Sequence, residues 1–387
     1  MCGAAIAEDD VGLPLGRIGG AGCHDPTLGE CNPGLLLVFV LVSKPFVAAR
    51  IEERFNRLVE RVLRRMGWVD TVIGYRGYAH RGRVRILCRV VLQPADMTTA
   101  VGLVTERLLA RRGFRNFLSA PIGHGEVHVT VGGITRSVRA DRGGYVDVAL
   151  ADIDLPAGEA EAEFVTAGSK PVRAPITVVA PEVTMGLVSD IDDTVISTSL
   201  PRPLIAAWNS FVVHENARQA VPGMAEMYAE MLHDHDGAPT VYVSTGAWNT
   251  AGFLTRFLQH YGFPSGPLLL TDWGPTPAGW WRSGPAHKRA CLQRLAEDFP
   301  GIRWVLVGDD GQHDPALYGD FASQHPDKVR AIALRELTPT EQVLAHGSPT
   351  AYVDAARADH SPVPVVKGPD GFRIWATLSR VLDQRQR

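Results

Sequence analysis

Apolar and polar residues follow one pattern in the second half of the chain. Short apolar runs, rich in residues that favour strands, alternate with longer segments whose apolar residues recur at helical spacing. Strands that alternate with helices pair in parallel, so this half predicts an α/β fold. We expect a doubly wound parallel sheet over residues 183–341, with strands at residues 185–189, 240–243, 267–270, 303–307 and 329–334.

The first half follows a different pattern, in which apolar and polar residues alternate one by one. Val127, Val129 and Val131 alternate with polar residues and lead into a Gly132-Gly133 turn, and other short strands follow. Regular short strands separated by turns are typical of a small β-sandwich. A small β-rich, sandwich-like domain is therefore expected to precede the parallel sheet.

Residues 50–66 predict an amphipathic helix, because apolar residues recur on one face and arginines line the remainder. Two interpretations remain open. The helix lies in a membrane interface, with its apolar face toward the lipid. Alternatively, the apolar face packs on a protein core and only the basic face is exposed.

Composition and the segments that lack a periodic apolar pattern divide the chain into four parts. Residues 1–44 are rich in Gly and lack periodicity, which is typical of an irregular or disordered tail. Residues 45–182 hold the basic helix and the β-rich domain, residues 183–341 the parallel sheet, and residues 342–387 a linker and a C-terminal helix. The apolar run at residues 35–42 is shorter than the ~20 residues that a membrane-spanning helix requires.

Composition also narrows the function. The five cysteines are scattered without a Cys-x-x-Cys pair, so we expect neither a zinc ribbon nor a redox motif, and reduced thiols favour a cytoplasmic protein. The net charge of −3 does not decide for or against a polyanionic partner, and we predict no nucleic-acid partner. Arginines outnumber acids between residues 50 and 142, which favours either an anionic membrane surface or a solvated basic face.

Polar residues stand where the predicted strands of the second half end, or at the start of a helix between them. In open α/β sheets, ligands bind at the carboxyl ends of the strands. These residues are Asp190, Asp192, Thr194, Ser244, Thr245, Lys288, Asp309, Asp310 and Asp314. Their identity, order and placement resemble the four motifs of the haloacid-dehalogenase superfamily, beginning with Asp-x-Asp-x-Thr at residues 190–194. The resemblance implies a haloacid-dehalogenase-like Rossmannoid with a minimal cap.

The resemblance implies a magnesium site made of carboxylates. Asp190 would bind Mg²⁺ with one oxygen and attack phosphorus with the other, forming an aspartyl phosphate. Asp192 would bind the ion through its backbone carbonyl, while its side chain protonates the leaving group and later deprotonates the attacking water. Asp309 would be the second carboxylate ligand. Asp310 and Asp314 would be further or water-mediated ligands.

The remaining motif residues would hold the phosphate. Ser244 would bind the phosphoryl oxygens together with backbone amides near Thr245. Thr194, at the end of the first motif, belongs to the same substrate-binding group. Lys288 would neutralise the negative charge that builds on these oxygens, or on the intermediate.

The residues around the motifs make the resemblance narrower. The segments 188–195, 242–249, 270–274, 287–288 and 307–314 resemble the catalytic domain of the actin-patch-protein family of phosphatidate phosphatases, which includes bacterial members. That resemblance implies a magnesium-dependent phosphatase of lipid metabolism that converts phosphatidate to diacylglycerol. The short gaps between the motifs and the tryptophans in these gaps favour a peripheral membrane protein that acts at the lipid surface. Two alternatives remain open: a soluble phosphatase acting on a phosphorylated metabolite or protein, and a non-catalytic membrane-surface adaptor.

Overall fold

The computed structural model of the protein describes residues 58–94, 120–197, 219–271, 284–311, 313–346 and 361–384. All the described elements belong to the unit Pro45–Arg387. The predicted tail lies outside the described residues. So do residues 50–57 of the predicted basic helix and residues 347–360 of the predicted linker.

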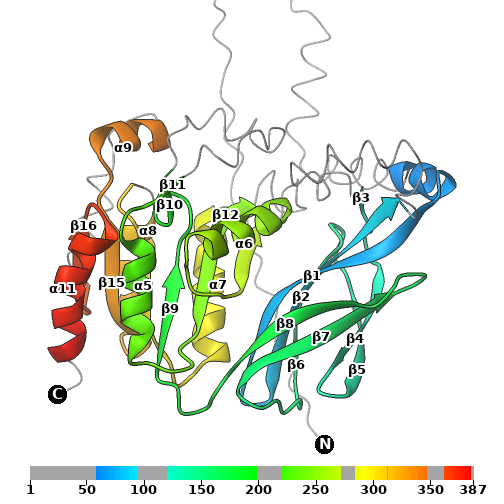
Figure 1. Ribbon diagram of the computed structural model, residues 1–387, viewed down its shortest axis with the longest axis horizontal. Helices are drawn as coiled ribbons and strands as arrows, with labels where there is room; N and C mark the ends of the chain where they lie inside the picture. Colours follow the sequence, from blue (N-terminus) through cyan, green and yellow to red (C-terminus); the bar gives the residue numbers. More distant parts are fainter. Residues whose placement is uncertain are drawn as a thin grey trace, which may run out of the picture. The chain divides into compact units, whose positions relative to one another are not determined.

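The first sheet has eight strands in the order β3-β2-β1-β8-β7-β4-β5, with β6 paired to β2. The strands are β1 (Trp68–His80), β2 (Arg83–Pro94), β3 (Ala120–Pro121), β4 (Glu126–Val131), β5 (Ile134–Arg139), β6 (Tyr145–Leu150), β7 (Gly158–Thr166) and β8 (Val172–Val179). β1 pairs in parallel with β8. The other described pairs of this sheet are antiparallel. The sheet curls into a half-barrel (Figure 1).

Turns and alternation explain these strands locally. Arg81 (φ 48°) and Gly82 (φ 74°) form the two-residue connection between β1 and β2, a left-handed conformation that matches the twist of a hairpin. The predicted Gly132-Gly133 turn joins β4 to β5. Val127, Val129 and Val131 are buried, whereas Glu126 and His128 are exposed, so one face of β4 lines the core of the half-barrel.

The second sheet is separate and all-parallel, with its strands in the order β13-β12-β9-β14-β15-β16. They are β9 (Met185–Ser189), β12 (Thr240–Ala247), β13 (Leu268–Thr271), β14 (Arg303–Asp309), β15 (Val329–Arg335) and β16 (Val365–Gly368). A small two-stranded ladder pairs β10 (Ile196–Ser197) with β11 (Gln219–Ala220). β9 is buried along its whole length and lies between β12 and β14, in the middle of the sheet.

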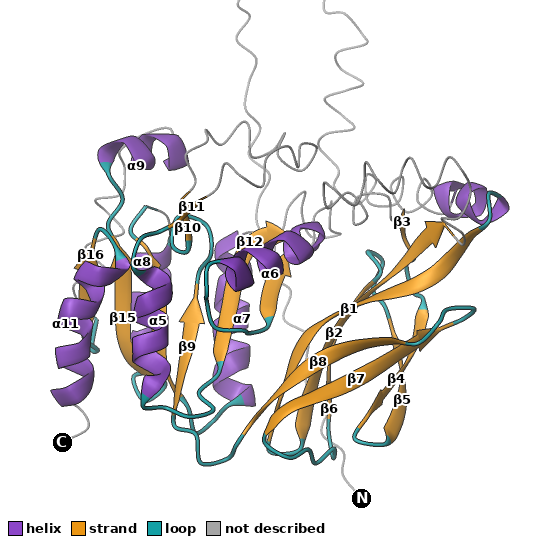
Figure 2. Cartoon of the chain, in the orientation of Figure 1, coloured by secondary structure: helices purple, strands orange, loops and turns teal. Residues whose placement is uncertain are grey.

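Helices accompany the second sheet (Figure 2). They are α5 (Met224–His233), α6 (Ala251–His260), α7 (Gly284–Asp298), α8 (Asp314–Gln324), α9 (Pro339–His346) and α11 (Gly371–Gln384), with a 3₁₀ turn at Trp248–Thr250. α7 packs on β12 and β13, α8 on β14 and β15, and α11 on α5, β15 and β16. In the described part of the chain, no helix is both long and apolar enough to cross a lipid bilayer.

This architecture corrects the predicted fold class. A doubly wound, haloacid-dehalogenase-like Rossmannoid with a minimal cap, preceded by a small sandwich-like domain, is wrong. The structure has a curled mixed sheet, a half-barrel, and a separate all-parallel sheet. Alternating strands and helices indicate parallel pairing, but they do not fix how the layers are arranged. Period-two alternation likewise marks one buried face of a strand, whether a second sheet or the curl of the same sheet covers it.

Candidate active site

The site starts at the carboxyl end of the buried strand β9. Its register with β14 places Ser189 beside Val307, and the backbone N–H of Asp190 donates to the carbonyl oxygen of Val307 at 2.9 Å. Asp190 follows β9 directly, and Asp309 is the last residue of β14. Two neighbouring parallel strands thus deliver their terminal carboxylates to the same edge, and both side chains are buried.

A third carboxylate and one ammonium complete this group. Asp190, Asp309 and Asp314 each place a carboxylate oxygen so that all three atoms lie within 4.8 Å of one another. Lys288 Nζ lies 2.7 Å from Asp190 Oδ1 and 2.6 Å from Asp314 Oδ1. We call these four residues the carboxylate cluster. Lys288 comes from α7 and Asp314 begins α8, so the cluster joins two strands and two helices.

Burial dominates the electrostatics of the cluster. It raises the pKa of Asp190 to about 8; Lys288 opposes this shift, while Asp314 and Asp192 add to it. Burial, together with Asp314 and Asp190, holds the pKa of Asp309 well above its ordinary value. For Lys288 burial works the other way, yet the three carboxylates around its ammonium raise its pKa. One ammonium faces three buried carboxylates, an excess of negative charge that favours a bound cation or proton.

The residues present fit a divalent cation. Asp314 Oδ2 is buried and has no hydrogen-bond partner among the described residues. A Cβ added at Gly308 would lie 2.5 Å from that oxygen, so only glycine leaves it room. Oxygen donors in a group of this size suit Mg²⁺ or Ca²⁺, and no cysteine or histidine belongs to the group. Asp190, Asp309 and Asp314 are the residues that would hold the ion.

Asp192 and Ser244 form a second pair beside the cluster. Ser244 Oγ donates to Asp192 Oδ2 at 3.0 Å and itself accepts from the backbone N–H of Gly246 at 2.9 Å. Asp192 is half-buried, whereas Ser244 is buried. Thr194 Oγ1 donates to Asp190 Oδ2 at 3.2 Å, which fixes the rotation of that carboxylate. These contacts leave Asp192 accessible while they orient it.

Two further predicted site residues lie outside the carboxylate cluster. Asp310 Oδ1 accepts from the backbone N–H of Leu337 at 2.8 Å, and Asp310 is not part of the carboxylate cluster. Its carboxylate therefore holds the chain after β15. Thr245 is exposed, and the structure ties down its backbone: Thr271 Oγ1 donates to the carbonyl oxygen of Thr245 at 2.7 Å.

The structure adds supporting residues that the sequence analysis missed. Arg335, the last residue of β15, donates to the carbonyl oxygen of Asp193 at 2.7 Å and to Glu341 Oε1 at 2.6 Å. Asp193 itself has a left-handed backbone (φ 61°), a conformation that needs such support in a residue other than glycine. Placement at a strand's carboxyl end is the signal that would have identified Arg335.

Ser189, the last residue of β9, supports the backbone of Asp190. Its hydroxyl donates to the carbonyl oxygen of Asp190 at 2.6 Å and lies 2.6 Å from the hydroxyl oxygen of Tyr228. Nothing in the spacing of the motifs indicates Tyr228, because it reaches the site from α5.

Comparisons with known proteins concern the second sheet. Residues 185–336 match the family described as "Phosphatidate phosphatase APP1, catalytic domain". The phosphatidate phosphatase APP1 of Saccharomyces cerevisiae is 28% identical over 152 residues, 39% of this chain and 26% of the yeast protein. An uncharacterized protein of Schizosaccharomyces pombe is 22% identical over 154 residues, 40% of this chain and 25% of that protein. The chain thus spans about a quarter of the length of these relatives.

These matches support the family resemblance that the motifs predicted, over the segment that contains the whole carboxylate cluster. Among solved structures, a carbohydrate acetylesterase from Xanthomonas citri aligns over 73% of this chain and 72% of its own, at 12% identity. Its TM-score of 0.25 is too low to carry an argument about fold or function.

Proposed function

We propose that the chain hydrolyses phosphatidate to diacylglycerol at a membrane surface, through an aspartyl phosphate formed on Asp190 and with Mg²⁺ as cofactor. One observation carries the proposal: three buried carboxylates and one buried lysine converge at the end of β9, inside the segment that is similar to a phosphatidate phosphatase catalytic domain. A binding module that only contacts lipid has no need to bury this charge.

The metal would be held by Asp190, Asp309 and Asp314, joined by the backbone carbonyl of Asp192. When bound, Mg²⁺ supplies positive charge that offsets the repulsion between these carboxylates and a phosphate dianion. Magnesium is the better fit than calcium for catalysis, because calcium accepts more ligands and would compete for both oxygens of Asp190.

The first step breaks the phosphate ester. One oxygen of Asp190 attacks phosphorus, and the bond from phosphorus to the glycerol oxygen breaks. The departing alkoxide takes a proton from Asp192, whose carboxylate Ser244 orients at 3.0 Å. Thr194 holds the Asp190 carboxylate, and Lys288, 2.7 Å from it, neutralises negative charge on the phosphoryl oxygens.

The second step releases phosphate. Water attacks phosphorus of the aspartyl phosphate, the phosphorus–Asp190 bond breaks, and Asp192 accepts the proton of the water. Asp190 returns as a carboxylate and Asp192 as a protonated acid, so the enzyme regains its starting state. Asp192 serves as acid and then as base, which suits its half-buried position beside the buried nucleophile.

The membrane part of the proposal rests on the helical residues 58–65. Leu58, Val62 and Met66 are 54%, 47% and 69% exposed, and Val69 just beyond is 40% exposed. Residues four apart lie on one face of a helix, so the first three form an exposed apolar stripe, and the exposed Arg61 and Arg65 lie on the same helix. Leu63 on the same helix packs against the half-barrel core, so the apolar stripe lies beside this contact and favours the interfacial interpretation for the exposed face.

The deciding experiment measures phosphate release from phosphatidate in anionic vesicles, lysophosphatidate, glycerol 3-phosphate and a phosphopeptide, each with Mg²⁺, with Ca²⁺ and with excess chelator. We expect Mg²⁺-dependent release, fastest from phosphatidate. Equal rates on glycerol 3-phosphate or the peptide would support the soluble phosphatase instead. No release from any substrate would leave the adaptor interpretation.

A variant pair tests the membrane contact separately. Val62→Glu should lower the rate on vesicles and the bound fraction in vesicle sedimentation, and leave the rate on lysophosphatidate below its micelle concentration unchanged. Phe372→Glu is the matched control, because Phe372 is 57% exposed and lies on α11. Equal effects of both variants would contradict a specific role of the stripe.

A further inference from the structure

An aromatic stack joins the half-barrel to the loop that carries Ser244. Trp248, only 8% exposed, follows that loop directly. Its ring lies 4.6 Å, centroid to centroid, from that of Tyr75 in β1 and 6.0 Å from that of Tyr145 in β6. The guanidinium of Arg89 in β2 covers the Tyr145 ring at 4.4 Å. Two strands of the half-barrel, β1 and β6, therefore contact Trp248, and β2 supports this contact through Arg89 on the Tyr145 ring.

Residues 244–246, an irregular part of β12 that we call the Ser244 loop, leave the regular ladder. β12 pairs with β13 at Val243 and again at Ala247, with a register shift between them. Ser244, Thr245 and Gly246 lie in this interval. Gly246 donates its N–H to Ser244 Oγ, and a Cβ at Gly246 would lie 3.1 Å from that oxygen, so the loop is tightly folded around the hydroxyl. Its position is set by its two ends, Val243 in the sheet and Trp248 in the stack.

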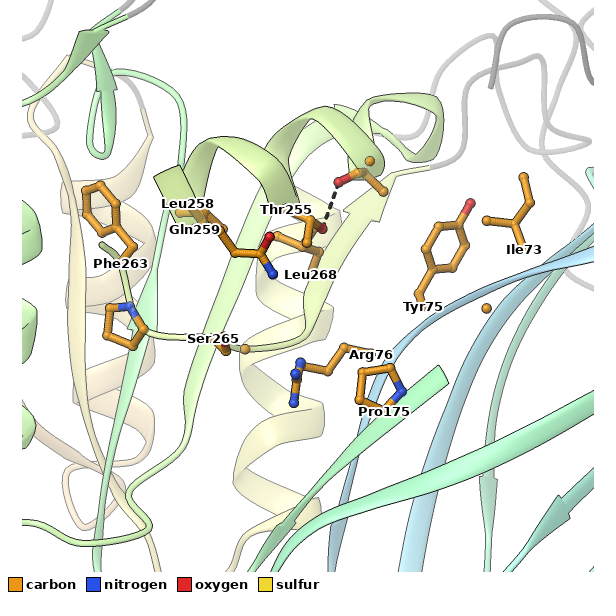
Figure 3. Close-up of a pocket in the computed structure, with 15 residues that line it drawn as sticks. Ile73, Tyr75, Arg76, Pro175, Thr255, Leu258, Gln259, Phe263, Ser265 and Leu268 are labelled. Carbon is orange, nitrogen blue, oxygen red and sulfur yellow. Dashed lines mark hydrogen bonds between the residues drawn. The ribbon is translucent and has the colours of Figure 1, made fainter. Parts of the chain in front are cut away.

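The surroundings make the stack important for that position. β1 and α6 face each other across a cavity of ≈ 310 Å³. Figure 3 shows Tyr75 and Arg76 on the β1 side and Thr255 and Leu258 on the α6 side. Tyr75, which lines this cavity, stacks on Trp248 and so brings β1 into contact with the 3₁₀ turn that leads into α6.

We infer that Tyr75 and Tyr145 of the half-barrel are positioning residues for the proposed reaction. By clamping Trp248 they fix the Ser244 loop, and Ser244 in turn orients Asp192, the proposed proton donor, at 3.0 Å. The inference rests on the proposed function and gives the half-barrel a part in it. The half-barrel then helps to position the catalytic residues and is not merely an independent domain beside them.

A second contact supports the same role. Tyr78 of β1 donates a buried hydrogen bond to Asp298 Oδ2 at 2.7 Å, and Arg294 Nη1 donates to Asp147 Oδ2 of β6 at 2.7 Å. Asp298 and Arg294 lie on α7, the helix that carries Lys288. The half-barrel thus contacts both of the elements that bring Ser244 and Lys288 to the site.

The inference makes a prediction that a general loss of stability does not. Proton donation matters when the leaving group is an alkoxide, as in phosphatidate, and matters little for 4-nitrophenyl phosphate, whose phenolate leaves as a stable anion. A misplaced Asp192 should therefore lower kcat/KM, which reports formation of the aspartyl phosphate, more for the alkyl ester than for the aryl ester. Damage to the fold, or to metal binding, should slow both alike.

The experiment uses the full chain with Mg²⁺ and measures kcat and KM on phosphatidate in mixed micelles and on 4-nitrophenyl phosphate. We expect Tyr75→Leu and Trp248→Leu to lower kcat/KM on phosphatidate about tenfold or more, and on the aryl ester by about threefold at most, because kcat/KM reports the step in which the leaving group departs. Trp248→Phe, which keeps an aromatic ring, should restore most of the loss. Tyr261→Leu is the matched control, since Tyr261 also stacks at 4.6 Å, on Phe257 of α6 and away from the site.

The outcomes separate the two proposals. A wild-type chain that is inactive on both esters overturns the proposed function and this inference with it. An active wild type whose Tyr75→Leu variant loses both activities equally, or neither, overturns the inference alone. If Trp248→Leu does not fold, Tyr75→Leu and Trp248→Phe decide, with melting temperatures measured alongside. Equal losses in Tyr75→Leu and in Tyr261→Leu also overturn it.

Discussion

The half-barrel and the parallel sheet both bury long apolar strands, but two of their ion pairs differ sharply in burial. In the half-barrel, Arg173 pairs with Glu163 at 3.2 Å while 66% and 36% of the two side chains stay exposed. In the parallel sheet, Lys288 pairs with Asp190 at 2.7 Å with only 9% and 4% exposed. The first pair is solvated on a surface, whereas the second is enclosed at the end of a strand.

The difference shows where function resides. An exposed ion pair adds about 0–1 kcal/mol and can be lost without consequence. A buried one demands desolvation of both charges, and replacing it by apolar side chains is often neutral or stabilising. A cluster of buried charges with shifted pKa values therefore points to chemistry or to ligand binding. By this criterion, among the described residues, the carboxylate cluster is the candidate catalytic centre.

The largest difference between the buried cluster and the exposed ion pairs should appear when the proposed nucleophile, Asp190, is replaced. Asp190→Asn should lower kcat about a thousandfold or more, because an amide cannot form the covalent intermediate. The melting temperature should change little, since the asparagine side chain keeps the size of the carboxylate. Glu159→Gln provides the control, as Glu159 pairs with Arg76 in the half-barrel with 59% of its side chain exposed. Activity of Asp190→Asn within tenfold of wild type contradicts the assignment.

The second test concerns stability. Lys288→Met removes the ammonium that contacts two buried carboxylates and should cost about 3–5 kcal/mol of unfolding free energy in the metal-free protein. Added Mg²⁺ should recover part of this loss by neutralising the same carboxylates. Arg173→Met in the half-barrel should cost at most about 1 kcal/mol, independent of Mg²⁺. Urea unfolding with chelator and with Mg²⁺ measures both; equal losses would remove the contrast between the two regions.

Much of the candidate site was predictable from the sequence, for a simple physical reason. Apolar runs that stop at polar residues mark the carboxyl ends of buried strands, and parallel strands bring those ends to one edge. That reasoning is local, so it placed Asp190 and Asp309 at strand ends, where the structure has them, whereas Ser244 lies within β12 at its register shift. It also gave the Gly132-Gly133 turn.

What failed depended on contacts between distant residues. β1 pairs with β8 across about a hundred residues, and this pairing turns the predicted sandwich into part of one curled sheet. No spacing within either strand encodes it. The contact of Asp310 with Leu337 is likewise non-local, because it joins the end of β14 to the segment after β15.

The carboxylate cluster should also make the stability of the protein depend on pH. Burial, with Asp314 and Asp192, raises the pKa of Asp190 to about 8 from an ordinary 3.8. A raised pKa favours the folded state when the group is protonated, so this contribution is full below pH 3.8 and is lost as pH rises through about 8. The melting temperature of the metal-free protein should fall across that window. Saturating Mg²⁺, or the Asp190→Asn variant, should reduce the slope; an unchanged slope in both would show that Asp190 does not titrate there.

The smallest expected effect separates the two acids that follow β14. Asp310→Asn should retain most activity and Mg²⁺ affinity, because its carboxylate accepts the N–H of Leu337 at 2.8 Å and an amide oxygen can do the same. The expected loss of stability is about 1 kcal/mol or less. Asp314→Asn, by contrast, removes charge from the cluster and should weaken Mg²⁺ binding at least about tenfold. Isothermal titration of both variants with Mg²⁺ measures the difference. If Asp310→Asn weakens Mg²⁺ binding as much as Asp314→Asn does, Asp310 belongs to the metal site and does more than hold the segment after β15.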